Sequence, residues 1–192
     1  MEVLRHANQV VGEPLYEWPL YSETGGEVLS SSGVHVQTSG AITEVPPDAN
    51  VILVGGTNVI RAASQKLLHW LRRVAVHGPL IGALCSATRV LAEAGLLAGH
   101  RATIHWELSE SLRETFPDIA ITNSLFEIDH NRLTCAGEAA SVDMVLNLLA
   151  SAHGKNVATA VAARILHGRI RSPEESQAPL ARRTGTRDKH HL

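Results

Sequence analysis

Two short apolar runs, each followed by a helical pattern, constrain the fold of this chain more than any other feature. Residues 51–56 read VILVGG and residues 80–84 read LIGAL. Such runs are typical of strands that are buried on both faces, as in parallel sheets covered by helices. A helical spacing of apolar residues follows each run, over 62–77 and over 86–94. This alternation predicts an α/β protein with a mostly parallel sheet and helices on both faces.

The same alternation continues to residue 166 and then stops. Further strands are predicted at 15–22, in a hairpin within 23–39, and at 100–106, 119–122, 125–129 and 132–136, and further helices at 107–116, 138–153 and 156–166. Residues 167–192 show no periodic pattern and are rich in arginine, at positions 169, 171, 182, 183 and 187. We therefore expect one domain over 1–166 and an extended tail or linker over 167–192.

Composition narrows the class of protein. The chain has 192 residues, 44% of them hydrophobic and 19% charged, and a net charge of −2, which gives no general attraction to nucleic acid or to a membrane. No apolar run approaches the roughly 18 residues that span a bilayer, and the opening MEVLRHAN is not a secretory signal. Cys85 and Cys135 do not form a disulfide framework, and no close His/Cys cluster indicates a zinc site. We expect a cytoplasmic protein without a metal or cofactor.

Cys85 lies where a buried strand passes into a helix. In open α/β sheets this carboxyl edge carries the functional sites, and the turn resembles the nucleophile elbow of hydrolases. The first N–H groups of the following helix and the helix dipole are expected to lower the thiol pKa. Ser86 is a candidate N-cap for that helix. The alternative is that Cys85 is a small buried apolar residue, as cysteine often is.

Other candidate site residues lie near strand ends. Gly55 and Gly56 end the preceding parallel strand, and glycines there let backbone amides approach a ligand or an oxyanion; a tight turn is an equally good interpretation. His105 ends the strand predicted at 100–106 and could act as base or ion-pair partner for Cys85, or be an ordinary polar residue. Trp106 is expected in the core or in a pocket wall, and Asp143 is expected to be structural.

Several segments together resemble a known family. They are LIGALCSATRVLAEAGLLAGHRATIHW (80–106), VILVGG (51–56), RLTCAGEAASVDMVLNLL (132–149), HGKNVATAVAARILH (153–167) and SQAPL (176–180). They resemble the amidotransferase-like, PfpI-like N-terminal domain of GlxA-type regulators of the AraC family. The resemblance covers almost the whole chain. It implies the flavodoxin-like fold of the class I glutamine amidotransferases.

The chain departs from the family pattern at both ends. It begins inside the segment that resembles the family's first helix, so we expect the first strand of the fold to be missing. In catalytic relatives that segment carries an acid beside the cysteine, and its absence argues against catalysis. No pair of helices resembling a DNA-reading unit is present, so DNA would be bound only through a missing C-terminal domain.

The resemblance implies that the domain senses a small effector, such as an amine or amino-acid derivative, and acts as a homodimer. Its pocket would be formed by Gly55, Gly56, Cys85, Ser86, His105, Trp106 and Gly137. The alternative is a stand-alone cysteine-dependent enzyme of the same superfamily, a hydratase, amidase-like hydrolase or glyoxalase-type catalyst. In that case Cys85 would attack the substrate and His105 would move protons. A third hypothesis is an inactive fragment that cannot fold without its first strand.

Overall fold

The computed structural model describes residues 1–56, 59, 63–76 and 78–177 of the chain. Its main sheet has four strands in the order β5 (Val51–Gly55), β6 (Ile81–Cys85), β10 (Arg132–Cys135) and β9 (Phe126–Asp129). β6 runs parallel to both β5 and β10, whereas β9 pairs antiparallel with β10 through the turn at His130 and Asn131. The predicted mostly parallel sheet is confirmed.

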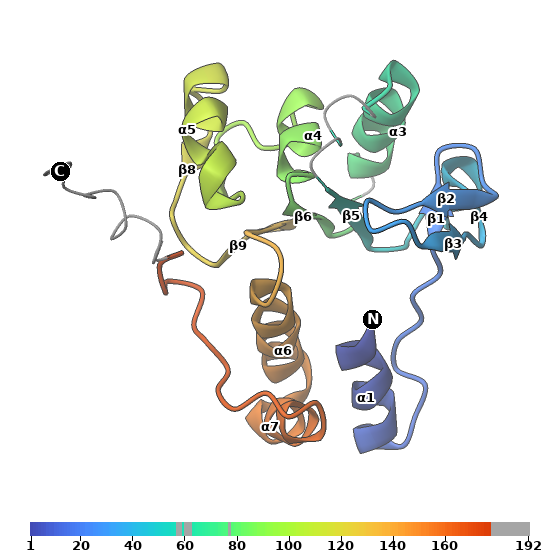
Figure 1. The fold of residues 1–192 in the computed structure, drawn as a ribbon, viewed down its shortest axis with the longest axis vertical. Helices are drawn as coiled ribbons and strands as arrows, with labels where there is room; N and C mark the ends of the chain where they lie inside the picture. The colour runs from blue at the N-terminus through green and yellow to red at the C-terminus, as the bar shows by residue number, and fades with distance from the viewer. Residues whose placement is uncertain (57–58, 60–62, 77, 178–192) are drawn as a thin grey trace, which may run out of the picture.

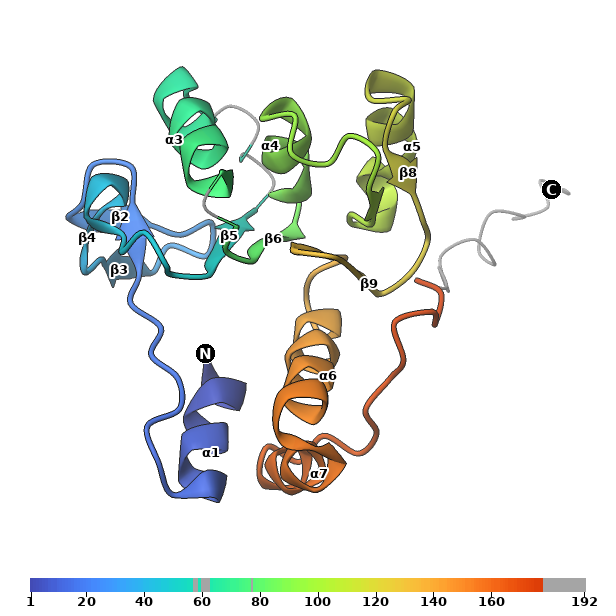
Figure 2. The same cartoon turned by 180° about the vertical axis from the view of Figure 1, so that it is seen from behind.

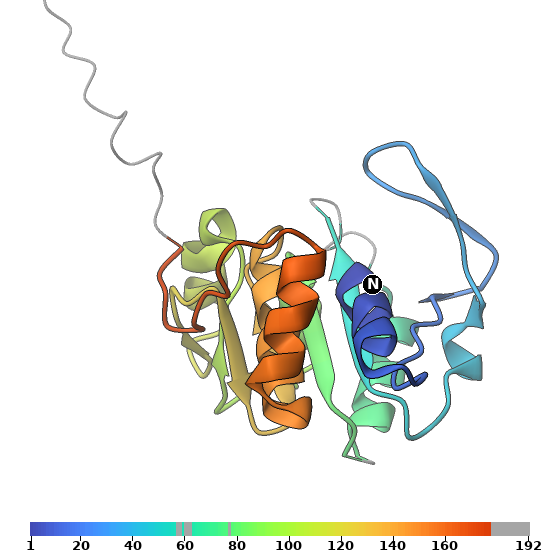
Figure 3. The same cartoon turned by 90° about the horizontal axis from the view of Figure 1, so that it is seen from below.

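Helices cover both faces of this sheet, as predicted (Figure 1). One layer contains α3 (Gln65–Ala75), α4 (Thr88–Glu93) and α5 (Trp106–Thr115). The other contains α1 (Glu2–Val11), α6 (Ala140–His153) and α7 (Lys155–Arg164), which lie side by side when viewed from below (Figure 3). Of the helix predicted at 62–77, residues 62 and 77 lie outside the described part. The described helix is N-capped by Ser64, whose hydroxyl accepts a hydrogen bond from the Leu67 N–H.

Short strands form three smaller sheets. β1 (Tyr21–Ser22) pairs with β4 (Gly40–Ala41), β2 (Glu27–Leu29) pairs with β3 (His35–Gln37) in the predicted hairpin, and β7 (Arg101–Ala102) pairs with β8 (Ala120–Ile121). The strand predicted at 15–22 is reduced to its last two residues, because Pro19 has no N–H to donate to a ladder. The strand predicted at 100–106 is likewise shorter and ends at Ala102.

The hydrophobic core is divided between the two helix layers. Leu71, Ile81, Leu91, Leu97 and Ile104 are fully buried between the sheet and the layer of α3, α4 and α5. A second apolar cluster joins α1, α6 and α7, and a third joins β9 and β10 to α6. Within the described residues, no helix is both long enough and apolar enough to cross a bilayer.

The burial of β5 differs from the prediction. The composition of 51–56 predicts a strand that is covered on both faces, but β5 is an edge strand of the main sheet, and Ile52 and Val54 are 40% and 77% exposed. α1 is the first element of the described chain. Figure 2 shows β5 at the end of the main sheet beside the small strands.

The path of the segment after α7 also differs from the predicted extended tail. Residues 167–177 contain no helix, but they return across the domain and do not leave it as a tail (Figure 1). The Leu125 N–H donates to the Pro173 carbonyl at 3.1 Å, and the Gln177 N–H donates to the Asn123 carbonyl at 2.9 Å. The folded domain therefore extends past residue 166 to at least Gln177. Residues 178–192, including three of the arginines of the predicted tail, lie outside the described residues.

Candidate functional site

Cys85 occupies the strand-to-helix turn that the sequence predicts. It is the last residue of β6, pairs in register with Gly55 of β5, and is half-buried. Its φ of 58° lies in the left-handed region, which a residue with a side chain rarely adopts. Such strain is concentrated at functional sites. Cys85 is therefore held at the carboxyl edge of the sheet in an unusual backbone conformation.

Ser86 has a different role from the one predicted. α4 begins at Thr88 after Ala87, so Ser86 is not its N-cap. The buried Ser86 hydroxyl instead donates to the carbonyl oxygens of Gly55 and Gly56, at 3.0 and 2.6 Å. These bonds fasten the end of β5 to the Cys85 turn. The same region shows why position 55 is glycine, because a Cβ there would collide with the Val59 side chain.

His105 and Trp106 belong to the start of α5, not to a strand end. The His105 ring caps this helix, with Nδ1 accepting from the Glu107 N–H at 3.4 Å. Trp106 is 43% exposed and is therefore not a core residue. The His105 and Trp106 rings lie 5.6 Å apart between centroids. Among the described residues, no hydrogen bond joins His105 to Cys85, so the expected Cys/His pair is not formed in this arrangement.

Gly137 packs directly against Cys85. A Cβ built on Gly137 would lie 2.7 Å from the Cys85 Cβ and 3.2 Å from its Sγ, and Gly137 has a φ of +102°. Cys135 lies beneath this contact, fully buried, with its Sγ accepting from the Gly137 N–H at 3.4 Å. Burial raises the pKa of the Cys135 thiol. Only glycine fits at position 137.

An open cavity of about 340 Å³ lies on the outer side of Gly137. Most of its wall comes from three segments: the start of α5, the loop from β10 into α6, and the segment that follows α7. Leu125, just before β9, completes it. The lining residues are His105, Trp106, Leu125, Ala136, Gly137, Glu138, Ala139, Ala140, Arg171, Ser176 and Gln177. Three of the predicted site residues, His105, Trp106 and Gly137, thus come together. Gly55, Gly56, Cys85 and Ser86 do not line the cavity, and Cys85 reaches it only through its contact with Gly137.

Arg171 contributes a cation to this wall and is held by Asp143. Asp143 is fully buried, and its carboxylate accepts hydrogen bonds from the Arg171 N–H at 2.8 Å, from Arg171 Nε at 2.8 Å and from His167 Nε2 at 2.7 Å. Burial by itself would raise the pKa of Asp143, but these hydrogen bonds outweigh it and hold the pKa below its ordinary value. The expectation that Asp143 is structural agrees with this geometry.

Sequence reasoning misses Arg171, Ser176 and Gln177 as cavity residues. The Gln177 amide donates to the carbonyl oxygens of Ile104 and Ser124, at 2.9 and 3.0 Å, and so anchors the segment beside α5. One signal is present in the sequence, because Ser176 and Gln177 begin the SQAPL motif that carries part of the resemblance.

The wall combines both signs of charge. Arg171 is cationic, and Glu138, at the entry to α6, is anionic with a φ of 48°. The positive end of the α6 dipole, which lies at this entry, also favours an anion. The lining offers His105 and Glu138 as potential metal ligands, but the group of three such side chains found within the described residues lies elsewhere, at His100, Asp129 and His130.

Comparison with known proteins places this domain in a family. The chain is 40% identical over 177 residues to the HTH-type transcriptional regulator CdhR of Pseudomonas aeruginosa, covering 92% of this chain and 52% of that one. It is 35% identical over 187 residues to the HTH-type transcriptional regulator GlxA of Rhizobium meliloti, covering 96% and 58%. The chain thus spans a little over half of the length of these regulators.

A solved structure of an AraC family transcriptional regulator from Pseudomonas putida superimposes with a TM-score of 0.76 at 26% identity, over 86% of this chain and 89% of that one. The resemblance deduced from the motifs and the flavodoxin-like fold it implies are therefore confirmed. Residues 9–151 match the model of the DJ-1/PfpI family. The chain belongs to the DJ-1/PfpI family, in the branch that includes the GlxA-type transcriptional regulators.

Proposed function

We propose that this domain is the effector-sensing part of an AraC-family transcriptional regulator and that the cavity beside Gly137 binds the effector. The observation that carries the proposal is the composition of the cavity wall. Its three main segments are the start of α5, the entry to α6 and the chain after α7. A ligand that contacts all three segments would change their relative positions. A sensor requires such a ligand-dependent change of conformation.

The charges of the wall favour a small zwitterion such as an amino-acid derivative or a related amine. Arg171 and the N-terminus of α6 suit a carboxylate, and Glu138 suits an ammonium group. The Trp106 ring provides an apolar face that can also attract a cation. Cys85 supports the floor of the cavity through Gly137 and is inherited from a catalytic ancestor.

DNA binding, dimerisation and a cytoplasmic location belong to the same proposal. The relatives are named as helix-turn-helix regulators, and this chain spans a little over half of their length. We therefore assign DNA contact to a helix-turn-helix domain outside these 192 residues. Homodimerisation would bring two such domains to adjacent half-sites.

The experiment is a thermal-shift screen of the purified chain against amines, amino acids and their N-methylated derivatives. A ligand that binds the folded state raises the melting temperature, and above Kd the stabilisation grows with the logarithm of the ligand concentration. Trp106→Ala and Arg171→Gln should abolish the shift. Arg169→Gln is the matched control, because Arg169 lies two residues away, is 68% exposed and pairs with Glu175, outside the cavity wall. An equal shift in all three variants would contradict the proposed cavity.

The strained turn at Cys85 favours a second candidate, a cysteine-dependent enzyme. Cys85→Ala distinguishes the two functions. In a sensor it leaves ligand binding measurable and removes no turnover, whereas consumption of a bound compound that depends on Cys85 would establish the enzyme.

A further inference from the structure

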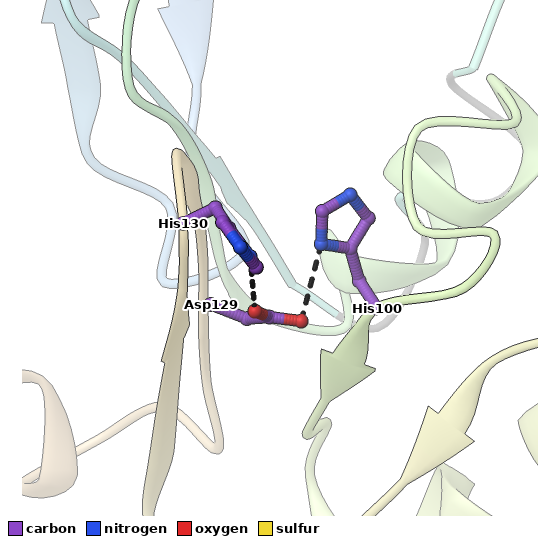
Figure 4. A group of neighbouring side chains, drawn as sticks. All are labelled: His100, Asp129 and His130. Atoms are coloured by element: carbon purple, nitrogen blue, oxygen red, sulfur yellow. Dashed lines mark hydrogen bonds and ion pairs between the residues drawn. The ribbon is translucent and has the colours of Figure 1, made fainter.

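Three potential metal ligands meet at the edge of the sheet opposite Cys85. His100 lies just before β7, Asp129 ends β9, and His130 lies in the turn that follows (Figure 4). One ligand atom from each lies within 4.8 Å of the other two. The start of β10 aligns with Ile81, at the beginning of β6, whereas Cys85 ends β6. This cluster is therefore separate from the cavity proposed to bind the effector.

Each carboxylate oxygen of Asp129 lies at hydrogen-bond distance from one of the two imidazole rings. His100 Nδ1 lies 3.1 Å from Oδ2, and His130 Nδ1 lies 2.6 Å from Oδ1 (Figure 4). The Arg101 N–H donates to Oδ2 at 2.9 Å and fixes the carboxylate further. The bonds from Arg101 and from the two rings occupy both carboxylate oxygens and fix the orientation of the group. The Nδ1 atoms of His100 and His130 therefore both face the carboxylate of Asp129.

The backbone of the turn places His130 in this cluster. His130 has a φ of 55°, a conformation in which glycine and asparagine are the usual residues. Its side chain is 84% exposed, yet it turns toward Asp129 and does not point away from the protein. The His100 and His130 rings lie 6.1 Å apart between centroids, so both flank the same carboxylate.

The surrounding charges leave the cluster accessible to a cation. The Arg101 guanidinium, on the residue after His100, pairs with Glu127 through two bonds of 3.1 Å. His100 and Asp129 are 25% and 20% exposed and His130 is largely exposed, so water can complete a coordination sphere.

We propose that His100, Asp129 and His130 form a binding site for a divalent transition-metal ion of the zinc type. Two imidazole nitrogens and one carboxylate oxygen are donors that Zn²⁺ and its neighbours accept, with water at the remaining position. Ca²⁺ and Mg²⁺ prefer a set of oxygen donors and are not expected to compete. The ion would take the place of the Nδ1 protons that lie between the rings and Asp129, and each neutral ring would then carry its single proton on Nε2. The bound ion would join the β9–β10 turn to the chain before β7.

The test is isothermal titration of the metal-stripped full chain with ZnCl₂ at neutral pH. The wild type should bind Zn²⁺ at this site, and MgCl₂ and CaCl₂ should give no heat. His130→Asn keeps a residue that tolerates positive φ, and His100→Gln keeps the size of the side chain. Each should weaken this binding at least about tenfold.

Two controls make the result specific. His35→Asn alters another exposed histidine that pairs with a single carboxylate, Glu27 at 2.6 Å, and should leave zinc affinity unchanged. A chain with His190→Ala and His191→Ala should also keep the site. Circular dichroism verifies that His130→Asn, at an exposed turn position, remains folded. The proposal is overturned if His130→Asn and His100→Gln bind as the wild type does, or if only the change at residues 190 and 191 removes binding.

Discussion

Arg171 Nε lies 2.8 Å from Oδ2 of Asp143, and the Arg171 backbone N–H lies 2.8 Å from Oδ1 of the same carboxylate. The two residues are 28 positions apart, one on α6 and one in the segment after α7. The pair thus fastens that segment to the domain at the point where it forms the cavity wall. Because Asp143 has no exposed surface and Arg171 is 30% exposed, the carboxylate depends on this contact more than the guanidinium does.

Asp143→Asn should destabilise the domain. The substitution leaves hydrogen-bond donors of Arg171 and His167 without their anionic acceptor in a buried place, which costs about 1–3 kcal/mol. The free energy of unfolding from urea denaturation measures this loss. Arg169→Gln is the control, because it breaks an exposed pair with Glu175, and pairs of that kind contribute roughly 0–1 kcal/mol. Equal losses in both variants would show that Asp143 does not anchor the segment.

The contribution of Asp143 should disappear in acid. The pKa of Asp143 is held below its ordinary value of 3.8 in the folded protein, so its stabilisation is complete above the pKa of the unfolded chain. It is lost as the pH falls through the folded-state pKa, because the unfolded chain takes up the proton first. The difference in unfolding free energy between wild type and Asp143→Asn should therefore be constant near neutrality and shrink below about pH 4. A difference that grows in acid would contradict this assignment.

The sequence predicts the elements that local patterns encode. A buried run followed by a helical spacing identifies β6 and α4, and parallel pairing then brings Gly55 beside Cys85. The pattern places His105 in the wrong element, because nothing local shows that its ring caps a helix through the Glu107 N–H. The composition of 51–56 likewise indicates a strand but cannot show that β5 lies at an edge.

The cavity wall after α7 cannot be predicted by periodicity. Residues 167–177 have neither a helical nor an alternating pattern, and such a stretch is typical of a linker. Their position is set by contacts distant in sequence, such as Arg171 with Asp143 and the Gln177 amide with the Ile104 carbonyl. The cluster at His100 escapes sequence reasoning for the same reason, since His100 and Asp129 are 29 residues apart.

Cys85 should react with iodoacetamide much faster than Cys135 in the folded protein at neutral pH. Cys135 is fully buried and its pKa is raised by burial, whereas Cys85 is partly exposed on a strained turn. Mass spectrometry of peptides from Cys85→Ser and Cys135→Ser chains gives the two rates separately. In denaturing urea the rates should converge. Equal rates in the folded protein would rule out an accessible, reactive Cys85.

Gly137→Ala should destabilise the domain through contact with Cys85. The new Cβ would lie 2.7 Å from the Cys85 Cβ, a separation that requires movement of the backbone, and overpacking of this kind costs typically about 1–3 kcal/mol. Gly99→Ala is the matched control, because Gly99 also has a positive φ, +75°, but no atom lies within 4 Å of its new Cβ. The excess loss in Gly137→Ala over Gly99→Ala therefore reports the steric contact and not the backbone conformation.

A double-mutant cycle with Cys85→Gly completes this prediction. Glycine at position 85 removes both the Cβ and the Sγ that a methyl group introduced at position 137 would meet, and it adopts the φ of 58° without strain. The double variant should therefore recover most of the steric part of the loss in Gly137→Ala, with a coupling free energy of roughly 1 kcal/mol or more. Additive losses, measured by urea denaturation, would show that Gly137 is required for a reason other than its contact with Cys85.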